Sequence, residues 1–276
     1  MKTIHTLKKV SLATFLTFVL SFSSVFAQND TMYIMKSGAI VGQYNVNTEV
    51  DSVIFYKPTI EETTSGTFID SRDGNEYNWV QIGDQVWMAE NLAYLPSVNM
   101  VADGSEDAAG SYYYVYGYNG TNVADAKATA NYNTYGVLYN WPAAMNGAAS
   151  STTNPSGVQG VCPDGWHLPS DAEWTELTDY LGGESVAGGK LKETGTTHWA
   201  SPNYEATNET GFTALPGGYR NFNGYFNLIG NYGYWWSATE YGTYLAWYRY
   251  MYYTGSDVDR DSDCKEVGFS VRCVRD

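Results

Sequence analysis

The stretch from residue 244 to residue 264 alternates side chains that are well suited to recognising a ligand. Alternate residues of a β-strand point to the same face of the sheet. By this rule Trp247, Arg249 and Met251 fall on one face, and tyrosines fall on the other. A turn over residues 253–256 leads into a returning segment whose aspartates share one parity. The predicted ligand-binding residues are Tyr244, Tyr248, Tyr250, Tyr252, Asp257, Asp259, Asp261 and Asp263.

This combination of residue types favours binding over simple stability. Four aspartates on one strand face repel one another, and aspartate has a low preference for strands. Tyrosine gives a large contact area at a low cost in side-chain entropy, and serine, glycine and aspartate supply adaptable hydrogen bonds. We therefore predict a ligand-binding face. The alternative is a solvated edge hairpin with ordinary surface tyrosines.

Signals for catalysis are sparse in this sequence. His167 lies in a Trp-His-Leu-Pro stretch and is expected to be a hydrogen-bonded structural residue, while His198 has no partner visible in the sequence. The Glu-Pro-Asn and Trp-Asn-Asp signatures of calcium-dependent sugar binding are absent, although acidic loops could still hold a calcium ion. We predict no catalytic residue, no metal site and no cofactor.

The first 27 residues have the three-part pattern of a secretory signal peptide. Lys2, Lys8 and Lys9 precede an apolar run over residues 10–22, and Ala27 ends a cleavage site. The run is shorter than the roughly 20 apolar residues that span a membrane. We expect cleavage after Ala27 and export, so that the protein is secreted or displayed at the cell surface, with no membrane span in the mature chain.

The charge of the exported part excludes some partners. It carries twelve Lys and Arg residues against thirty Asp and Glu residues, because only three lysines lie in the signal peptide. The negative electrostatic field of this excess of acidic residues repels the phosphates of nucleic acids. Three cysteines are present, so an exported protein is expected to form one disulfide and leave one thiol over.

The mature chain is predicted to contain two parts. Residues 28–58 read as a small β-rich segment of two or three strands, followed by a polar linker over 59–66. The main domain spans 67–276. It opens with hairpin signals over 68–88, contains long loops between 96 and 160, and returns to strands after 211. One helix is signalled at Ser170 by a capping box with Glu173, and a second over 185–193.

Six blocks in order resemble one known family, the Fibrobacter succinogenes major paralogous domain. The resemblance covers residues 66–276, and the segment 31–58 resembles a short strand motif seen ahead of such domains in secreted Bacteroidetes proteins. The blocks are Thr67–Gly74, Gln85–Leu92, Val161–Trp174, Gly211–Arg220, Gly233–Glu240 and Gly268–Arg275.

Residues 168–174 and the terminal Gly-Phe-x-Val-Arg also resemble the formylglycine-generating enzyme group. That resemblance implies an α+β fold, a C-type lectin-like domain with two short helices, antiparallel strands and long loops. The enzymes bind copper through two closely spaced cysteines late in the domain, whereas Cys264 has no near partner, so we do not expect an enzyme. Cys162 and Cys273 lie in the shared blocks, and the resemblance implies a disulfide between them.

The residue types of the hairpin suggest how the face was generated. Tyr, Thr, Gly, Ser, Asp and Cys can all be reached from an Asn codon by changing its adenines, while Trp247, Arg249, Val258 and Arg260 form a constant frame. This pattern resembles the variable region of proteins diversified by a retroelement, whose targets commonly have C-type lectin-like folds. Cys264 then fits as one random outcome.

The sequence leaves three functions open. The first is an extracellular binding protein for an unknown protein or glycan. The second is a structural subunit of the cell envelope or of a fibre, in which the segment 31–58 pairs with a neighbour. The third is a degenerate oxidoreductase of the formylglycine-generating type.

Overall fold

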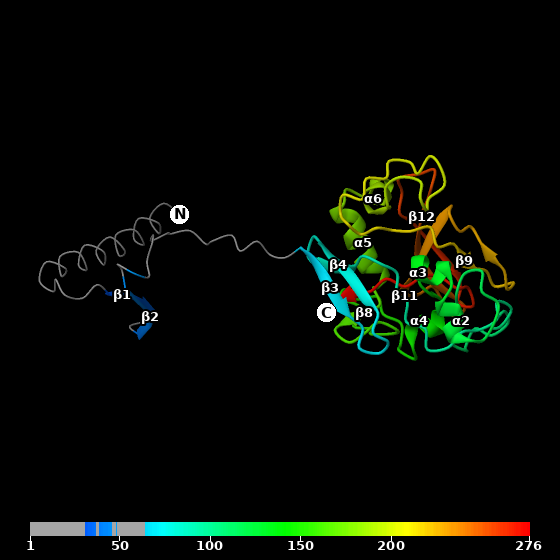
Figure 1. Cartoon of the computed structure of the whole chain (residues 1–276), viewed down its shortest axis with the longest axis horizontal. Coiled ribbons are helices and arrows are strands. Elements are labelled where there is room, and N and C mark those ends of the chain that lie inside the picture. The colour runs from blue at the N-terminus through cyan, green and yellow to red at the C-terminus, as the bar shows by residue number, and fades with distance from the viewer. Residues whose placement is uncertain (1–30, 37–38, 46–47, 49–63) are drawn as a thin grey trace, which may run out of the picture. The chain divides into compact units, whose positions relative to one another are not determined.

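A computed structural model describes residues 31–36, 39–45, 48 and 64–276 (Figure 1). The chain divides into two compact units, Met1–Glu61 and Glu62–Asp276. The predicted signal peptide, the third strand expected near residues 53–56 and most of the predicted linker lie outside the described residues.

The first unit contains an antiparallel hairpin. Strand β1 (Thr31–Lys36) pairs with β2 (Ala39–Asn45), with a bulge between Ile34 and Met35. These are the first two strands predicted for this segment. Several apolar side chains of the hairpin are exposed, namely Tyr33, Ile34, Ile40, Val41 and Tyr44.

The second unit contains a five-stranded antiparallel sheet that joins its beginning to its end. The strand order is β3 (Ser65–Ile69), β4 (Glu76–Ile82), β5 (Gln85–Met88), β14 (Val274–Arg275), β8 (Trp166–His167). The carboxyl terminus therefore lies beside the strands that open the unit (Figure 1). The hairpins predicted over 68–88 are confirmed, and Gly74 adopts the positive φ of 79° that the first turn requires.

Both predicted helices are present. Helix α5 (Asp171–Tyr180) starts with a complete capping box, in which the Ser170 hydroxyl accepts from the Glu173 N–H and the Glu173 carboxylate accepts from the Ser170 N–H. It ends before Gly182 and Gly183. Helix α6 (Glu184–Leu191) follows.

The region expected to form long loops is more ordered than the sequence indicated. It contains helices α2 (Val123–Lys127), α3 (Ala130–Tyr135) and α4 (Trp141–Met145), and the two-stranded pair β6 (Tyr113–Tyr114) and β7 (Leu138–Tyr139). Each helix is capped by the side chain of an Asn or Thr at its N-cap. Helices of five or six residues are too short to show the apolar periodicity by which helices are recognised in a sequence.

The remaining strands form two further sheets. A short hairpin pairs β9 (Tyr219–Arg220) with β10 (Phe226–Asn227). A three-stranded antiparallel sheet has the order β11 (Tyr232–Glu240), β12 (Leu245–Tyr252), β13 (Asp259–Cys264). The fold is thus mixed α+β, with several antiparallel sheets and short helices.

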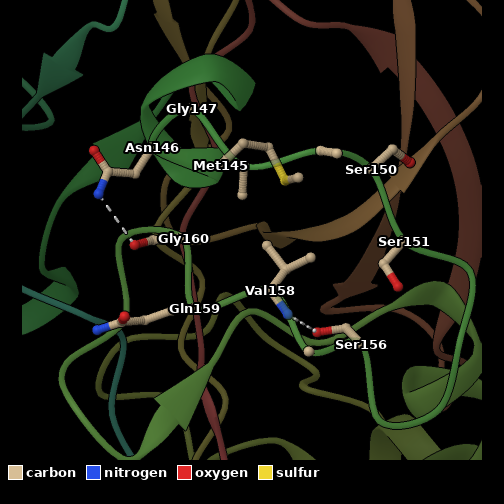
Figure 2. A pocket seen from close by; sticks show the side chains of 12 residues that line it. Met145, Asn146, Gly147, Ser150, Ser151, Ser156, Val158, Gln159 and Gly160 are labelled. Carbon is tan, nitrogen blue, oxygen red and sulfur yellow. Dashed lines mark hydrogen bonds between the residues drawn. The ribbon is translucent and has the colours of Figure 1, made fainter.

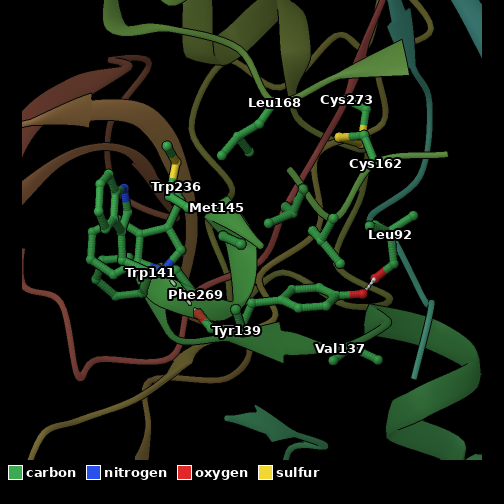
Figure 3. Close-up of a cluster of buried hydrophobic side chains, with 14 of the residues drawn as sticks. Leu92, Val137, Tyr139, Trp141, Met145, Cys162, Leu168, Trp236, Phe269 and Cys273 are labelled. Carbon is green, nitrogen blue, oxygen red and sulfur yellow. Dashed lines mark hydrogen bonds between the residues drawn. A yellow bond between two sulfur atoms is a disulfide. The ribbon is translucent and has the colours of Figure 1, made fainter. Parts of the chain in front are cut away.

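Two apolar clusters lie against opposite faces of the three-stranded sheet. Figure 3 shows the first, in which Trp141, Trp236 and Phe269 gather on one side of Tyr139. The second cluster joins α5 to the sheet through Trp174, Trp235 and Met251. Both faces of the sheet are therefore partly covered, which bears directly on which of its side chains meet solvent.

Candidate ligand-binding face

The three-stranded sheet brings tyrosines from two strands and aspartates from a third onto one face. On β12, Tyr252 pairs with Tyr232 and Tyr250 pairs with Tyr234 of β11. Directly paired residues of antiparallel strands point to the same side. On the other flank Tyr250 pairs with Asp259 of β13. We define the tyrosine–aspartate face as Tyr232, Tyr234, Tyr248, Tyr250, Tyr252, Asp259, Asp261 and Asp263.

The rings of this face pack against one another. The ring centroids of Tyr232 and Tyr252 are 5.7 Å apart, and that of Tyr234 is 5.9 Å from Tyr250 and 5.9 Å from Tyr248. Such aromatic pairs contribute about 0.5–1.5 kcal/mol each beyond the area they bury. The mutual contacts hold the rings as one preassembled surface.

The face changes from core to surface along β12. Tyr248 is only 8% exposed, and its ring centroid lies 4.6 Å from that of the buried Phe269. Tyr250, Tyr252 and Tyr232 are half-buried and reach solvent. The prediction that Tyr248 is an exposed contact is therefore wrong. Strand parity shows which side chains share a face, but it does not show that the terminal segment carrying Phe269 covers one end of it.

Two other predicted residues lie beyond the strands. Tyr244 is 71% exposed in the loop between β11 and β12, and within the described part of the chain it has no ring contact with the face. Asp257 lies ahead of β13, and its Oδ2 accepts a hydrogen bond from the Tyr252 hydroxyl at 3.0 Å. Asp257 therefore borders the face at the tip of the hairpin.

The opposite side of the sheet is clamped to helix α5 by arginines. The buried Arg249 Nη2 lies 3.0 Å from Asp171 Oδ1, and its Nη1 also pairs with Glu184. Arg260 Nη2 lies 2.8 Å from Asp171 Oδ2. This side is the scaffold that the sequence predicted from Trp247, Arg249 and Met251.

The carboxylates of the face have no cationic partner. Within residues 64–276, no Lys, Arg or His lies within 4.0 Å of Asp259, Asp261 or Asp263. Burial, reinforced by neighbouring carboxylates, raises the pKa of Asp259 and of Asp263. In both cases these effects outweigh a hydrogen bond that acts in the opposite direction, from Tyr250 and from the Cys264 N–H respectively.

Two of the aspartates also close the edge of the sheet. The Lys265 N–H donates to the Tyr244 carbonyl, so the alternating N–H groups of Ser262 and Cys264 point away from β12. Asp261 Oδ1 accepts from the Ser262 N–H, and Asp263 Oδ1 accepts from the Cys264 N–H, both at 2.7 Å. β13 pairs only with β12 among the strands described. Side-chain oxygens thus satisfy edge donors that could otherwise pair with another strand.

The sequence reasoning missed the tyrosines that β11 and β9 contribute. Tyr232 adds a half-buried ring to the face, and Tyr234 adds a buried one that is only 8% exposed. The ring of Tyr219 lies 5.1 Å from that of Tyr234. The sequence did contain a signal for these residues, because tyrosines occupy alternate positions in Tyr232-Gly233-Tyr234, as they do in β12. What the sequence lacked was the pairing between β11 and β12.

The family model of the Fibrobacter succinogenes major domain matches residues 80–275, which include every strand of this face. The chain belongs to this family. No curated protein and no solved structure shows significant similarity to the chain. Among the described residues of this family member, no helix is long and apolar enough to cross a membrane.

The disulfide lies within the matched Fibrobacter succinogenes major domain. Cys162 and Cys273 are bonded, which confirms the predicted pair, and the bridge ties the chain next to β8 to the start of β14 (Figure 3). Cys264 is a free thiol whose pKa is raised, first by burial and then by the nearby Asp263.

His167 of the matched domain is held between two carboxylates. Its Nε2 lies 2.6 Å from Glu173 Oε1, and its Nδ1 lies 2.7 Å from Asp276 Oδ1. Burial alone would lower the pKa of His167, but the hydrogen bonds and charges of Glu173 and Asp276 outweigh it, and the pKa is raised. His198 has a partner that the sequence did not reveal, because Glu193 lies 2.9 Å from its Nδ1.

Several hollows of the surface lie away from the tyrosine–aspartate face. Figure 2 shows one that is formed by residues 145–151 and 156–160, where Asn146 donates to the Gly160 carbonyl and the Val158 N–H donates to Ser156. Its walls are mainly glycine, alanine and serine, and no acidic or basic side chain lines it. It offers less chemistry for recognition than the tyrosine–aspartate face.

Proposed function

We propose that this chain is an exported binding protein, released or held at the cell surface, and not an enzyme. Its tyrosine–aspartate face would contact an extracellular protein or glycan. The observation that carries the proposal is the preassembled set of half-exposed rings, Tyr232, Tyr250 and Tyr252, next to carboxylates that have no cationic partner.

Binding at this face would require little further ordering of side chains. Association orders side chains, and each ordered side chain costs about 0.5–1.5 kcal/mol. The rings of the face are already restrained by contacts with one another, so a ligand would gain their area with little further ordering. Tyrosine also offers an apolar ring and a hydroxyl to the same ligand.

The layout also fits a domain that tolerates variation on one face. The face residues Tyr250, Tyr252 and Asp259 point away from the scaffold, whereas Arg249 and Arg260 hold the opposite side to α5. This separation supports the proposal that the hairpin is a retroelement-diversified region on a C-type lectin-like fold. The proposal of a diversified region would be supported by a near-copy of the 3′ end of the gene, next to a reverse transcriptase gene, that has Asn codons in place of those for Tyr and Asp. A genomic neighbourhood with neither feature would contradict it.

The test compares a variant that removes tyrosines of the face with a control variant that removes exposed tyrosines elsewhere. The exported chain is screened on protein and glycan arrays as wild type, as Y232S/Y250S/Y252S, and as Y180S/Y225S. Tyr180 and Tyr225 are exposed and lie off the face. We expect the first variant to lose the array ligands and the second to keep them. Equal retention by both variants would contradict the proposal.

A second candidate is an assembly subunit, favoured by the first unit. The β1–β2 hairpin exposes Ile40 and Val41 together with Tyr33, Ile34 and Tyr44, and exposed apolar surface of this kind marks interaction sites. Sedimentation of the chain with and without residues 28–58 tests it. The same number of subunits per particle in both forms would argue against assembly through this segment.

A further inference from the structure

We infer that the partner presents Lys or Arg side chains of a polypeptide to the tyrosine–aspartate face. This inference rests on the proposed function and names the chemistry of its ligand. It follows from the charge of the face, from the spacing of its carboxylates and from two arginine sites elsewhere in the same chain.

The tyrosine–aspartate face carries negative charges that no cationic side chain of the described residues neutralises. Asp259 and Asp261 stand beside Tyr250 and Tyr248 in the pairing of β12 with β13. The nearby cations are engaged elsewhere. Arg249 and Arg260 bind Asp171 on the opposite side, Lys265 binds Glu240, and the buried Lys192 donates to the carbonyls of Tyr252 and Gly255. A partner of opposite charge would therefore meet carboxylates that no side chain of the described residues neutralises.

A cation at this face could use a ring and a carboxylate at once. Positive side chains lie favourably over aromatic rings, and their hydrogen bonds to carboxylates are among the stronger ones in proteins. Asp259 is partly desolvated and is repelled by the neighbouring carboxylates of Asp257, Glu184 and Asp261, which together raise its pKa. An incoming ammonium or guanidinium group would relieve that repulsion.

The chain already binds its own arginines in this way. Arg72 lies 3.9 Å from the ring centroid of Tyr94 while its Nη2 lies 2.7 Å from Asp70 Oδ2. Arg260 lies 3.4 Å from the ring centroid of Trp247 while its Nε lies 2.9 Å from Asp171. Each site combines one aromatic ring with one carboxylate, as Tyr250 and Asp259 do on the open face.

The spacing favours an extended peptide. Asp259 and Asp261 are two residues apart on one strand, which places them about 6.6–6.8 Å apart along it. Alternate side chains of an extended partner have the same repeat. Because Asp261 and Asp263 close the β13 edge, we expect contact through side chains and not through main-chain pairing.

The experiment measures fluorescence anisotropy of three labelled peptides with the full exported chain. One peptide alternates Lys and Ser, one carries acetyl-lysine in place of Lys, and one alternates Glu and Ser. The face variant is D259N/D261N, in which Asn keeps an acceptor for the Ser262 N–H. The control is D84N/D179N, which removes two exposed carboxylates beside Tyr180 and so makes the same change in net charge.

We expect only the Lys–Ser peptide to bind, and we expect D259N/D261N to weaken its binding about tenfold while the control stays within about twofold. Equal weakening by both variants would show attraction by bulk charge alone and overturn the inference. Neutral or acidic array ligands that Y232S/Y250S/Y252S abolishes would also overturn it, but would leave the proposed function standing. Array ligands that survive the tyrosine variant would contradict both.

Discussion

Asp261 Oδ1 accepts a hydrogen bond from the backbone N–H of Ser262 at 2.7 Å, and this bond faces the open edge of the sheet that carries the tyrosines. Asp263 repeats the arrangement with Cys264. Residues that the sequence marks as ligand contacts therefore also protect the edge of the strand. The two roles can be separated, because edge protection needs only an acceptor, whereas recognition of a cation needs the charge.

Removing both acceptors should promote self-association. In D261A/D263A the N–H groups of Ser262 and Cys264 lose their partners and become available to a strand of another molecule. We expect a higher weight-average mass than wild type in sedimentation velocity. D261N/D263N is the control, because Asn retains a side-chain carbonyl, and it should sediment as wild type. Association by both variants would point to charge loss instead.

Tyr248 and Tyr252 should differ sharply in their contribution to stability. Tyr248 packs on Phe269 in the core, so Y248A should lower the free energy of unfolding by about 3–5 kcal/mol, as large-to-small aromatic changes do. Tyr252 is half-exposed and makes two ring contacts, so Y252A should cost about 1–2 kcal/mol. Urea unfolding followed by tryptophan fluorescence measures both. Equal losses would mean that both rings belong to the core.

Tyr250 and Tyr252 should lose their phenolic protons only at high pH. Burial, followed by the nearby Asp259 and Asp257, raises the pKa of Tyr250 and of Tyr252 to about 12. A pKa raised in the folded state gives stability that is present below the unfolded value of about 10 and is lost as the pH rises from 10 toward 12. Ultraviolet titration at the phenolate absorption band should show two fewer tyrosines ionising near pH 12 in Y250F/Y252F than in wild type. An unchanged titration curve would contradict these assignments.

His167 should make the fold less stable as the pH rises above neutrality. Its pKa is raised in the folded state, so the stabilisation is full below about 6.5, its unfolded value, and is lost as the pH passes through the higher folded pKa. H167Q should remove this dependence. The measurement is the melting temperature of both proteins at steps between pH 5 and pH 9. Parallel curves for wild type and H167Q would show that another group is responsible.

The sequence by itself determined the features that depend on near neighbours. The capping box of Ser170 and Glu173 predicted the start of α5 correctly, because its donors and acceptors lie three residues apart. The parity of β12 likewise separated Tyr250 from Arg249, because successive side chains of a strand alternate. The disulfide between Cys162 and Cys273 followed from the resemblance to a known family, which carries long-range information that one pattern of residues lacks.

Only the tertiary structure decided which of these side chains meet solvent and which partners they have. Tyr248 is buried because Phe269, far along the chain, packs against it, and Tyr232 joins Tyr252 because β11 pairs with β12 in one register. Pairing and burial depend on the free energy of contacts between distant segments, and no local periodicity encodes that choice. The residue types of the face could therefore be predicted from the sequence. The fold determined which residues belong to the face and how deeply each side chain is buried.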